Sequence, residues 1–275
     1  MSNPKALLEE YEIDPKRALG QNFLHDPNML EKIVETGEVT KNDIVIEIGP
    51  GTGALTHVLA QNAKHVYCIE IDMRLQTLLE NELAPYDNVS IIWADVLKTN
   101  IAELVGESPY LLVANVPYYI TSAIIKHFLE DSPRPQRVVM TIQYELAERI
   151  TATPNNMSLL AVSVQYFGSP EIITRMKPAV FWPRPEIDSA VLKIDVFDQP
   201  PVEVSSDKAF FRVVRAGFSQ KRKQLRNSLG GGLGIKAKES GALIEQAGID
   251  PQRRAETLTI AEWGALARLA DELSE

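Results

Sequence analysis

Short apolar runs alternate with helical patterns over the first 150 residues, and this alternation constrains the fold more than any other feature. We predict strands at residues 44–48, 66–71, 89–93, 110–114 and 137–142. We predict helices between or after them, at residues 54–62, 74–83, 121–129 and 144–150. Short, continuously apolar strands that are separated by helices are typical of a parallel sheet with both faces covered. Because such crossovers are right-handed, we predict the α/β class with a doubly wound, Rossmann-like sheet.

The pattern changes in the last third of the chain. Residues 170–196 contain further strand-like segments, which we expect to complete the sheet with an antiparallel edge. After Gln199-Pro200-Pro201 the sequence predicts only helices, at residues 210–218, 221–229, 236–247 and 260–273. The triplet Gly230–Gly232 is expected to break the helical pattern. We therefore predict a main domain over residues 1–200 and a small all-helical domain over residues 201–275.

Composition excludes several classes of protein. The 275 residues include 28 basic and 37 acidic side chains, a net charge of −9, with 45% hydrophobic residues, as in ordinary globular chains. The one cysteine, Cys68, lies in an apolar run, so we expect a buried thiol, no internal disulfide and a reducing compartment. No secretory signal, membrane-spanning stretch or paired Cys or His spacing is visible. We expect a cytoplasmic monomer with no membrane contact and no metal.

Three candidate ligand-binding features follow the first three predicted strands. Gly49 and Gly51 lie in a glycine-rich loop, Glu70 ends the second strand, and Asp95 follows the third. Ligands bind beyond the carboxyl ends of parallel strands, where glycines let the backbone approach closely. A carboxylate at Glu70 can accept two ribose hydroxyls, and one at Asp95 can accept an adenine amino group. The loop also satisfies the dinucleotide fingerprint, so it leaves NAD, S-adenosylmethionine and a simple tight turn open, with Asp95 slightly favouring S-adenosylmethionine.

The segment Asn115-Val116-Pro117-Tyr118 follows the fourth predicted strand, beside this loop in the expected topology. An exocyclic amine of a nucleobase is a poor nucleophile because its lone pair is delocalised into the ring. The Asn115 amide oxygen and a backbone carbonyl next to the proline can accept its N–H bonds and favour attack on a methyl donor. Tyr118 offers a face on which the base can stack. The motif favours amine methylation over hydride transfer. The alternative without a function is a strand that ends at a proline, followed by a tyrosine that belongs to the core.

Five motifs together resemble the ribosomal RNA adenine N6-dimethyltransferase family, in order and over nearly the whole chain. They are Gly20–Leu24, Glu47–Gly53, Asn115–Tyr118, the segment Phe181-Trp182-Pro183-Arg184-Pro185-x-x-x-Ser189, and Lys221–Asn227. The resemblance is nearest to the bacterial enzymes of the small ribosomal subunit. It implies S-adenosylmethionine as cofactor and dimethylation of two adjacent adenosines near the 3′ end of 16S rRNA. It also implies an immature small ribosomal subunit as the partner.

The resemblance assigns roles position by position. In the cofactor site it places Asn22 and Leu24 at the methionine end, Gly49 and Gly51 in the loop, Glu70 at the ribose, Asp95 near adenine, and Asn115 beside them. In the catalytic site it places Asn115, Pro117, Tyr118 and, on the far face of the target adenine, Phe181. Val116 and Trp182 depart from residues that are more common in the family, which puts the shape of the Trp182 loop in doubt.

Charge is unevenly distributed along the chain. Residues 1–200 carry 16 basic and 27 acidic side chains, giving −11, whereas residues 201–275 carry 12 and 10, giving +2. Nine basic residues and no acidic residue lie between Lys208 and Lys238. A solvated helix face would have the same composition, but part of this block also matches a family motif. We predict RNA contacts there, with an unpaired or flipped target base. The residues assigned to RNA binding are Lys221, Arg222, Lys223 and Arg226.

Two further functions remain open from the sequence. A sister class methylates one adenosine of large-subunit rRNA, and its members share the same kinds of motif. The chain could also act mainly as an assembly factor that docks on an immature small subunit, although the intact Asn115-x-Pro117-Tyr118 segment favours catalysis. A dehydrogenase is disfavoured by that same segment.

Overall fold

The computed structural model describes residues 3–16, 19–131 and 133–272, which form two compact units. Unit 1 lies within residues 1–147 and 170–196, and unit 2 lies within residues 148–169 and 197–275. The change of unit at residue 197 is close to the division predicted at residue 200. The prediction did not include residues 148–169 in the helical unit. Their main element is the largely apolar helix Leu159–Phe167, whose sequence carries no information about its packing partner.

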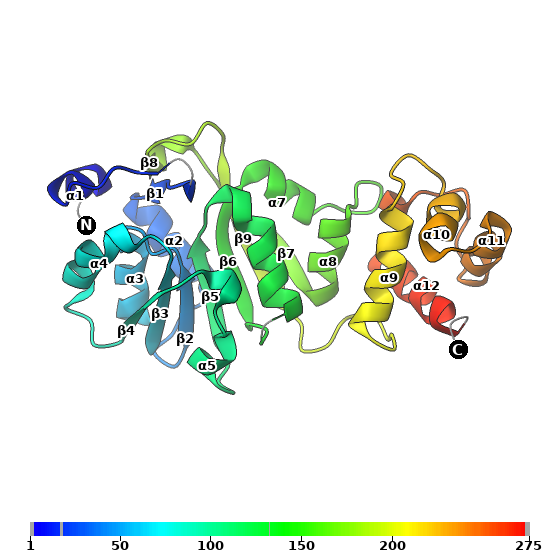
Figure 1. The fold of residues 1–275 in the computed structure, drawn as a ribbon, viewed down its shortest axis with the longest axis horizontal. Coiled ribbons are helices and arrows are strands. Elements are labelled where there is room, and N and C mark those ends of the chain that lie inside the picture. Colours follow the sequence, from blue (N-terminus) through cyan, green and yellow to red (C-terminus); the bar gives the residue numbers. More distant parts are fainter. Residues whose placement is uncertain (1–2, 17–18, 132, 273–275) are drawn as a thin grey trace. The chain divides into compact units, whose positions relative to one another are not determined.

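Unit 1 contains a seven-stranded sheet with the strand order β4-β3-β2-β5-β6-β9-β7 (Figure 1). Five successive strands, β4, β3, β2, β5 and β6, run parallel to one another. Strand β9 pairs with β6 in the antiparallel direction. The predicted doubly wound sheet with an antiparallel strand is confirmed. The strands are β2 (Ile44–Ile48), β3 (His65–Glu70), β4 (Val89–Trp93), β5 (Tyr110–Asn115), β6 (Arg137–Gln143), β7 (Gly168–Met176) and β9 (Ser189–Val196).

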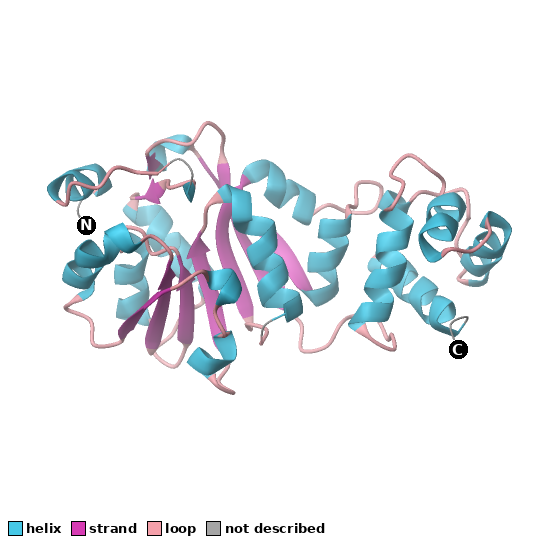
Figure 2. Cartoon of the chain, in the orientation of Figure 1, coloured by secondary structure: helices cyan, strands magenta, loops and turns pink. Residues whose placement is uncertain are grey.

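Helices lie on both sides of this sheet (Figure 2). They are α1 (Pro4–Glu10), α2 (Pro27–Gly37), α3 (Ala54–Asn62), α4 (Gln76–Leu83), α5 (Ile101–Val105) and α6 (Thr121–Lys126), and α7 (Tyr144–Ile150) spans the change of unit. Short 3-10 turns follow three of the strands, at residues 73–75, 96–98 and 118–120, and a fourth spans residues 178–180. One π-helical turn covers residues 127–131.

The core of unit 1 follows the two-residue periodicity of its strands. Val45 on β2 and Val113 on β5 point to one face, where they pack against apolar side chains of α2 and α3. Ile46 and Leu112 point to the opposite face and are also fully buried. Burial on both faces explains why these strands are continuously apolar rather than alternating.

The order of the strands creates a crevice at the carboxyl ends of β2 and β5. The chain leaves β2 outward to β3 and β4 and then returns to β5, which pairs with the other side of β2. Connections that leave adjacent strands in opposite directions open a binding crevice between them. A second, two-stranded sheet pairs β1 (Phe23–Leu24) with β8 (Phe181–Trp182) and brings two sequence motifs together.

Unit 2 packs its helices around aromatic side chains. Its helices are α8 (Leu159–Phe167), α9 (Asp207–Phe218), α10 (Leu225–Leu233), α11 (Ala237–Gln246) and α12 (Ile260–Glu272). The rings of Tyr166 and Phe210 stack with 4.1 Å between their centroids. Trp263 is fully buried, and a Cβ at Gly217 would come within 2.8 Å of its indole ring. Gly217 therefore allows α9 and α12 to approach each other closely.

Two expectations about α10 were wrong. Gly230–Gly232 lie inside the helix, which ends at Leu233 and is capped by Gly234 in the left-handed conformation (φ 74°). Glycine is retained there because a Cβ at Gly232 would come within 2.6 Å of the Ala216 Cβ and 2.9 Å of the Ala216 carbonyl oxygen on α9. The helix also begins at Leu225 rather than at residue 221, since residues 221–223 form the turn after α9.

We predict opposite effects for alanine at two neighbouring glycines of α10. Gly232→Ala should lower the free energy of unfolding by about 1–3 kcal/mol, because the new methyl group overlaps the backbone of α9. Gly231→Ala should leave it unchanged or raise it by up to about 1 kcal/mol, because alanine favours a helix and its nearest neighbour is the mobile end of Gln220. Chemical denaturation of both variants tests the pair. Equal effects at the two positions would contradict the packing role of Gly232.

Candidate active site

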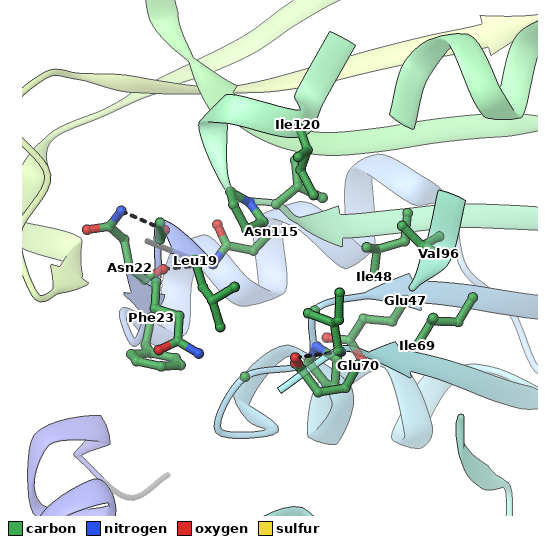
Figure 3. A pocket seen from close by; sticks show the side chains of 18 of the residues that line it. Leu19, Asn22, Phe23, Glu47, Ile48, Ile69, Glu70, Val96, Asn115 and Ile120 are labelled. Atoms are coloured by element: carbon green, nitrogen blue, oxygen red, sulfur yellow. Dashed lines mark hydrogen bonds between the residues drawn. The ribbon is translucent and has the colours of Figure 1, made fainter. Parts of the chain in front are cut away.

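A cavity of about 300 Å³ lies at the carboxyl ends of β2, β3 and β5. It is the size of a small-molecule site. Figure 3 shows Leu19, Asn22 and Phe23 on one side of it, with Glu47 and Glu70 on the other. The cavity is lined by every residue that the sequence assigned to the cofactor, namely Asn22, Leu24, Gly49, Gly51, Glu70, Asp95 and Asn115.

Glu70, the last residue of β3, presents a nearly buried carboxylate to the cavity. Its Oε1 accepts hydrogen bonds from the backbone N–H groups of Ile71 (2.9 Å) and Asp72 (2.8 Å), and the Gly51 N–H also donates to the carboxylate. Burial raises the pKa of Glu70, while these three donors oppose the rise. The carboxylate is thus held in one orientation by the backbone of two adjacent loops.

Asp95 and Gly49 shape the adjoining walls. Asp95 Oδ1 accepts the Leu97 N–H at 3.1 Å and begins the 3-10 turn after β4, so its carboxylate lies at the edge of the cavity. Gly49 has φ 67°, a conformation that favours glycine, and a Cβ there would meet only the Asn115 carbonyl oxygen at 3.9 Å. A side chain at Gly49 would therefore occupy the cavity instead of the ligand.

The opposite wall is the segment Leu19–Leu24, which is joined to β5 by one hydrogen bond. The Asn115 Nδ2 donates to the Asn22 carbonyl oxygen at 3.1 Å, and the Asn22 side chain donates to the Gly20 carbonyl oxygen at 3.1 Å (Figure 3). Because Nδ2 makes this bond, Oδ1 is the atom of the Asn115 amide that remains to accept a proton donor in the cavity. These bonds bring together two of the sequence motifs, Gly20–Leu24 and Asn115–Tyr118.

Tyr118 is fixed by its hydroxyl group. The hydroxyl lies 2.6 Å from the Oγ of Ser189, a fully buried residue at the start of β9. Burial raises the pKa of Tyr118, which the bond to Ser189 partly offsets, so the phenol stays protonated at neutral pH. Tyr118 and Pro117 both line the cavity.

Phe181 is the one predicted catalytic residue that the structure does not bring to the cavity. It pairs with Leu24 across the β1–β8 sheet, is 1% exposed and packs in the core with α2 and α3. A short strand pair turns its ring inward, and this pairing could not be inferred from the sequence. A different aromatic residue, Tyr119, lines the cavity with 62% of its surface exposed.

Sequence reasoning also missed a buried acid in the cavity wall. Glu47 on β2 is 1% exposed and accepts a hydrogen bond from the Thr56 hydroxyl at 2.6 Å and from the Cys68 thiol at 3.5 Å. Burial raises the pKa of Glu47 to about 7. Cys68 is buried, as predicted. The signal available in the sequence was an acidic residue inside an otherwise apolar strand.

A second missed group ties the N-terminal segment to the end of β3. Asp72, 5% exposed, accepts hydrogen bonds from Gln21 Nε2 at 2.9 Å and from Arg74 Nε at 2.9 Å. Arg74 also donates to the Asp14 carbonyl oxygen at 3.0 Å. These contacts lower the pKa of Asp72 against the effect of burial, so it stays ionised. The cluster fixes Gln21 beside the cavity wall that contains Asn22.

The residues predicted to bind RNA lie in unit 2, around the turn between α9 and α10. Lys221, Arg222, Lys223 and Arg226 are all exposed. Over the described parts of the chain, no helix is long and apolar enough to cross a membrane. The same described residues include no group of three or more His, Cys, Asp or Glu side chains that could hold a metal ion.

Comparison with known proteins agrees with the motifs. The model of the family Ribosomal RNA adenine dimethylase matches residues 14–272. The chain belongs to this family. It is 45% identical over 268 residues to ribosomal RNA small subunit methyltransferase A of Clostridium botulinum (strain Okra), covering 96% of this chain and 97% of that protein. The corresponding protein of Dehalococcoides mccartyi (strain 195) is 40% identical over 273 residues, covering 99% and 94%.

Two solved structures share the fold of this adenine dimethylase chain. The 23S rRNA methyltransferase ErmE is 28% identical with a TM-score of 0.75, and the match covers 91% of this chain and all of that one. A dimethyladenosine transferase from Plasmodium falciparum is 25% identical with a TM-score of 0.76, covering 89% and 95%. The α/β class and the family predicted from the sequence are confirmed.

The buried Glu47 of this adenine dimethylase should make stability depend on pH. Its pKa is about 7 in the folded chain against an ordinary 4.5, so between these values the unfolded chain releases a proton that the folded chain retains. The free energy of unfolding should therefore fall as pH rises through this range, by up to about 3 kcal/mol at 1.36 kcal/mol per pKa unit. Glu47→Gln should lack this contribution. Chemical denaturation at pH 5 and pH 8 gives the free energy of unfolding of both proteins. The difference between wild type and variant should change with pH, and a constant difference would contradict the assigned pKa of Glu47.

Proposed function

We propose that this chain transfers methyl groups from S-adenosylmethionine to the N6 amine of two adjacent adenosines near the 3′ end of 16S rRNA in the small ribosomal subunit. The observation that carries the proposal is the hydrogen bond from Asn115 Nδ2 to the Asn22 carbonyl. The bond occupies the amide donor and leaves Oδ1 as the acceptor of a residue that lines the cavity, together with two acids suited to adenosine. A hydride-transfer enzyme has no use for such an amine acceptor.

The cavity suits S-adenosylmethionine by its hydrogen-bond acceptors and by the open space beside its glycine loop. Glu70 has a fixed carboxylate for the ribose hydroxyls, and Asp95 lies one strand away for the adenine amino group. Gly49 leaves open space where any other residue would place a Cβ. Asn22 and Leu24 line the wall assigned to the methionine end. When bound, the cofactor supplies an electrophilic methyl group on a sulfonium.

The residues of the chain then act on the target amine. The Asn115 Oδ1 and the Val116 carbonyl accept its two N–H bonds, which favours a pyramidal nitrogen whose lone pair points at the methyl group. Tyr118 stacks on the adenine, since its ring is held by Ser189. No strong base is needed, because the nitrogen becomes acidic once it is alkylated. The raised pKa of Tyr118 agrees with a stacking role rather than a proton-accepting one.

The small subunit is the better supported substrate of the two classes of rRNA. Relatives named for the small subunit are 40–45% identical over almost their full length, whereas the 23S rRNA enzyme is 28% identical. The RNA would be held through Lys221, Arg222, Lys223 and Arg226, whose side chains are exposed. An immature small subunit with an unpaired adenosine pair is the proposed partner.

Asn115→Ala should nearly abolish methyl transfer while reducing cofactor affinity much less than Glu70→Gln does. The substitution removes the amine acceptor, and loss of one such preorganised contact costs about 10²–10³ in rate. Transfer is measured with radiolabelled cofactor on small subunits from cells that lack the protein. The matched variant Glu70→Gln should show the reverse pattern, with weakened cofactor affinity by calorimetry. Normal turnover in Asn115→Ala would refute the assigned mechanism.

Replacing Arg222, Lys223 and Arg226 together by Ala should weaken RNA binding and reduce its salt dependence. Each phosphate contact that is lost should lower the slope of log affinity against log salt by about 1. The control variant replaces Lys5, Lys32 and Lys126, three exposed lysines of unit 1, and removes the same total charge. The control should keep the wild-type slope. Equal slopes for all three proteins would exclude the motif from the RNA interface.

A further inference from the structure

Tyr119 is an exposed aromatic side chain at the cavity to which no role has yet been given. It follows Tyr118 in a 3-10 turn after β5, lines the cavity and keeps 62% of its surface exposed. Ligand sites are lined predominantly by apolar and aromatic side chains, and this ring lies in the wall of the proposed active site. Its neighbour Tyr118 is anchored to Ser189, so the two rings have different environments.

The position of the Tyr119 ring is fixed by the backbone of the first motif. A Cβ at Gly20 would come within 3.3 Å of Tyr119 Cδ1 and 3.1 Å of Pro117 Cβ, so the ring packs directly on Gly20. Gly20 also accepts the hydrogen bond from the Asn22 side chain, and Asn22 in turn accepts the bond from Asn115. The ring therefore belongs to the same framework as the amine acceptor, with one part packed and the rest open to solvent.

We propose that Tyr119 is the stacking platform for the nucleotide next to the target adenosine. This inference rests on the proposed function. An unpaired base that enters the cavity leaves its neighbour unstacked on that side, and aromatic side chains commonly replace lost base stacking in single-stranded RNA. Tyr118 would hold the target base, and Tyr119 would hold the adjacent base one nucleotide away. Stacking on the ring requires no hydrogen bonds to the base. The platform therefore accepts an adenosine whether or not its amine is already methylated.

A platform on one side of the target has a consequence for a substrate with two adjacent adenosines. When the 5′ adenosine is the target, its partner lies on the 3′ side of the target. When the 3′ adenosine is the target, its partner lies on the 5′ side. A ring on one fixed side of the target stacks the partner adenosine for only one of the two targets, and stacks a nucleotide outside the pair for the other. Tyr119→Ala should therefore slow methylation of one adenosine more than the other, and mass spectrometry of the rRNA measures that ratio.

Binding of a hairpin RNA with two adjacent unpaired adenosines tests the platform directly. Tyr119→Ala should weaken binding between about fivefold and about a hundredfold, the fold-change that corresponds to the loss of one aromatic stack. Tyr119→Phe should bind as wild type, because stacking needs the ring and not the hydroxyl. Met73→Ala removes another exposed apolar side chain that does not line the cavity and should also bind as wild type.

Removal of the neighbouring base separates stacking from a structural effect of the substitution. An abasic site on the platform side should weaken binding to wild type as much as Tyr119→Ala does, and should cause no further loss in Tyr119→Ala. An abasic site on the other side should weaken both proteins equally. Independent, additive losses on both sides would overturn the inference. Methyl transfer by the wild type is measured in parallel, so its absence would reject the proposed function, whereas normal transfer with additive losses would reject only the role of Tyr119.

Discussion

The bond from Asn115 Nδ2 to the Asn22 carbonyl joins the two halves of the site, and most other features of unit 1 support it. Asn115 is the last residue of β5, which is paired with β2, and the connections after these two strands leave in opposite directions. Asn22 is placed by the β1–β8 pair and by its own bond to Gly20. An amide that uses its donor in this way is orientated before any substrate arrives, which is what electrostatic preorganisation requires.

Acidic side chains lie at and beside a cavity that is proposed to take a base of a negatively charged RNA. Glu47 and Glu70 line this cavity, and Asp72 bonds to the lining residue Gln21. Glu70 is held by three backbone N–H groups, and Asp72 is paired with Arg74 and Gln21. The burial of Glu47 favours its protonated form near neutral pH. These carboxylates are thus partly neutralised or engaged with fixed donors, so the repulsion that they exert on an approaching phosphate is smaller than their number implies.

Sequence patterns predicted the elements whose signal is local. Strand β2 and helix α3 have the predicted bounds, because an apolar run that ends in a glycine loop is unambiguous. Phe181 does not line the cavity, because its direction depends on pairing with Leu24, more than 150 residues earlier in the chain. The continuation of the helix through Gly230–Gly232 was missed because glycine propensity opposes it, and close contact with Ala216 on α9 explains the glycine at position 232. In both cases the structure depends on contacts between residues far apart in the chain. Such contacts produce no periodic pattern in the local sequence.

A net charge of −9 disfavours binding of RNA over the whole surface of the protein, but the structure shows that the charges are engaged unevenly. Many acidic side chains of unit 1 are engaged with fixed donors, such as Asp72 and Glu70, whereas the basic residues around the turn between α9 and α10 are exposed. Electrostatic attraction depends on the charges that face solvent within a Debye length of about 8–10 Å, not on the sum over the chain. RNA recognition by this protein should therefore be local, with exposed cations binding phosphates and a small aromatic and amide site selecting the base.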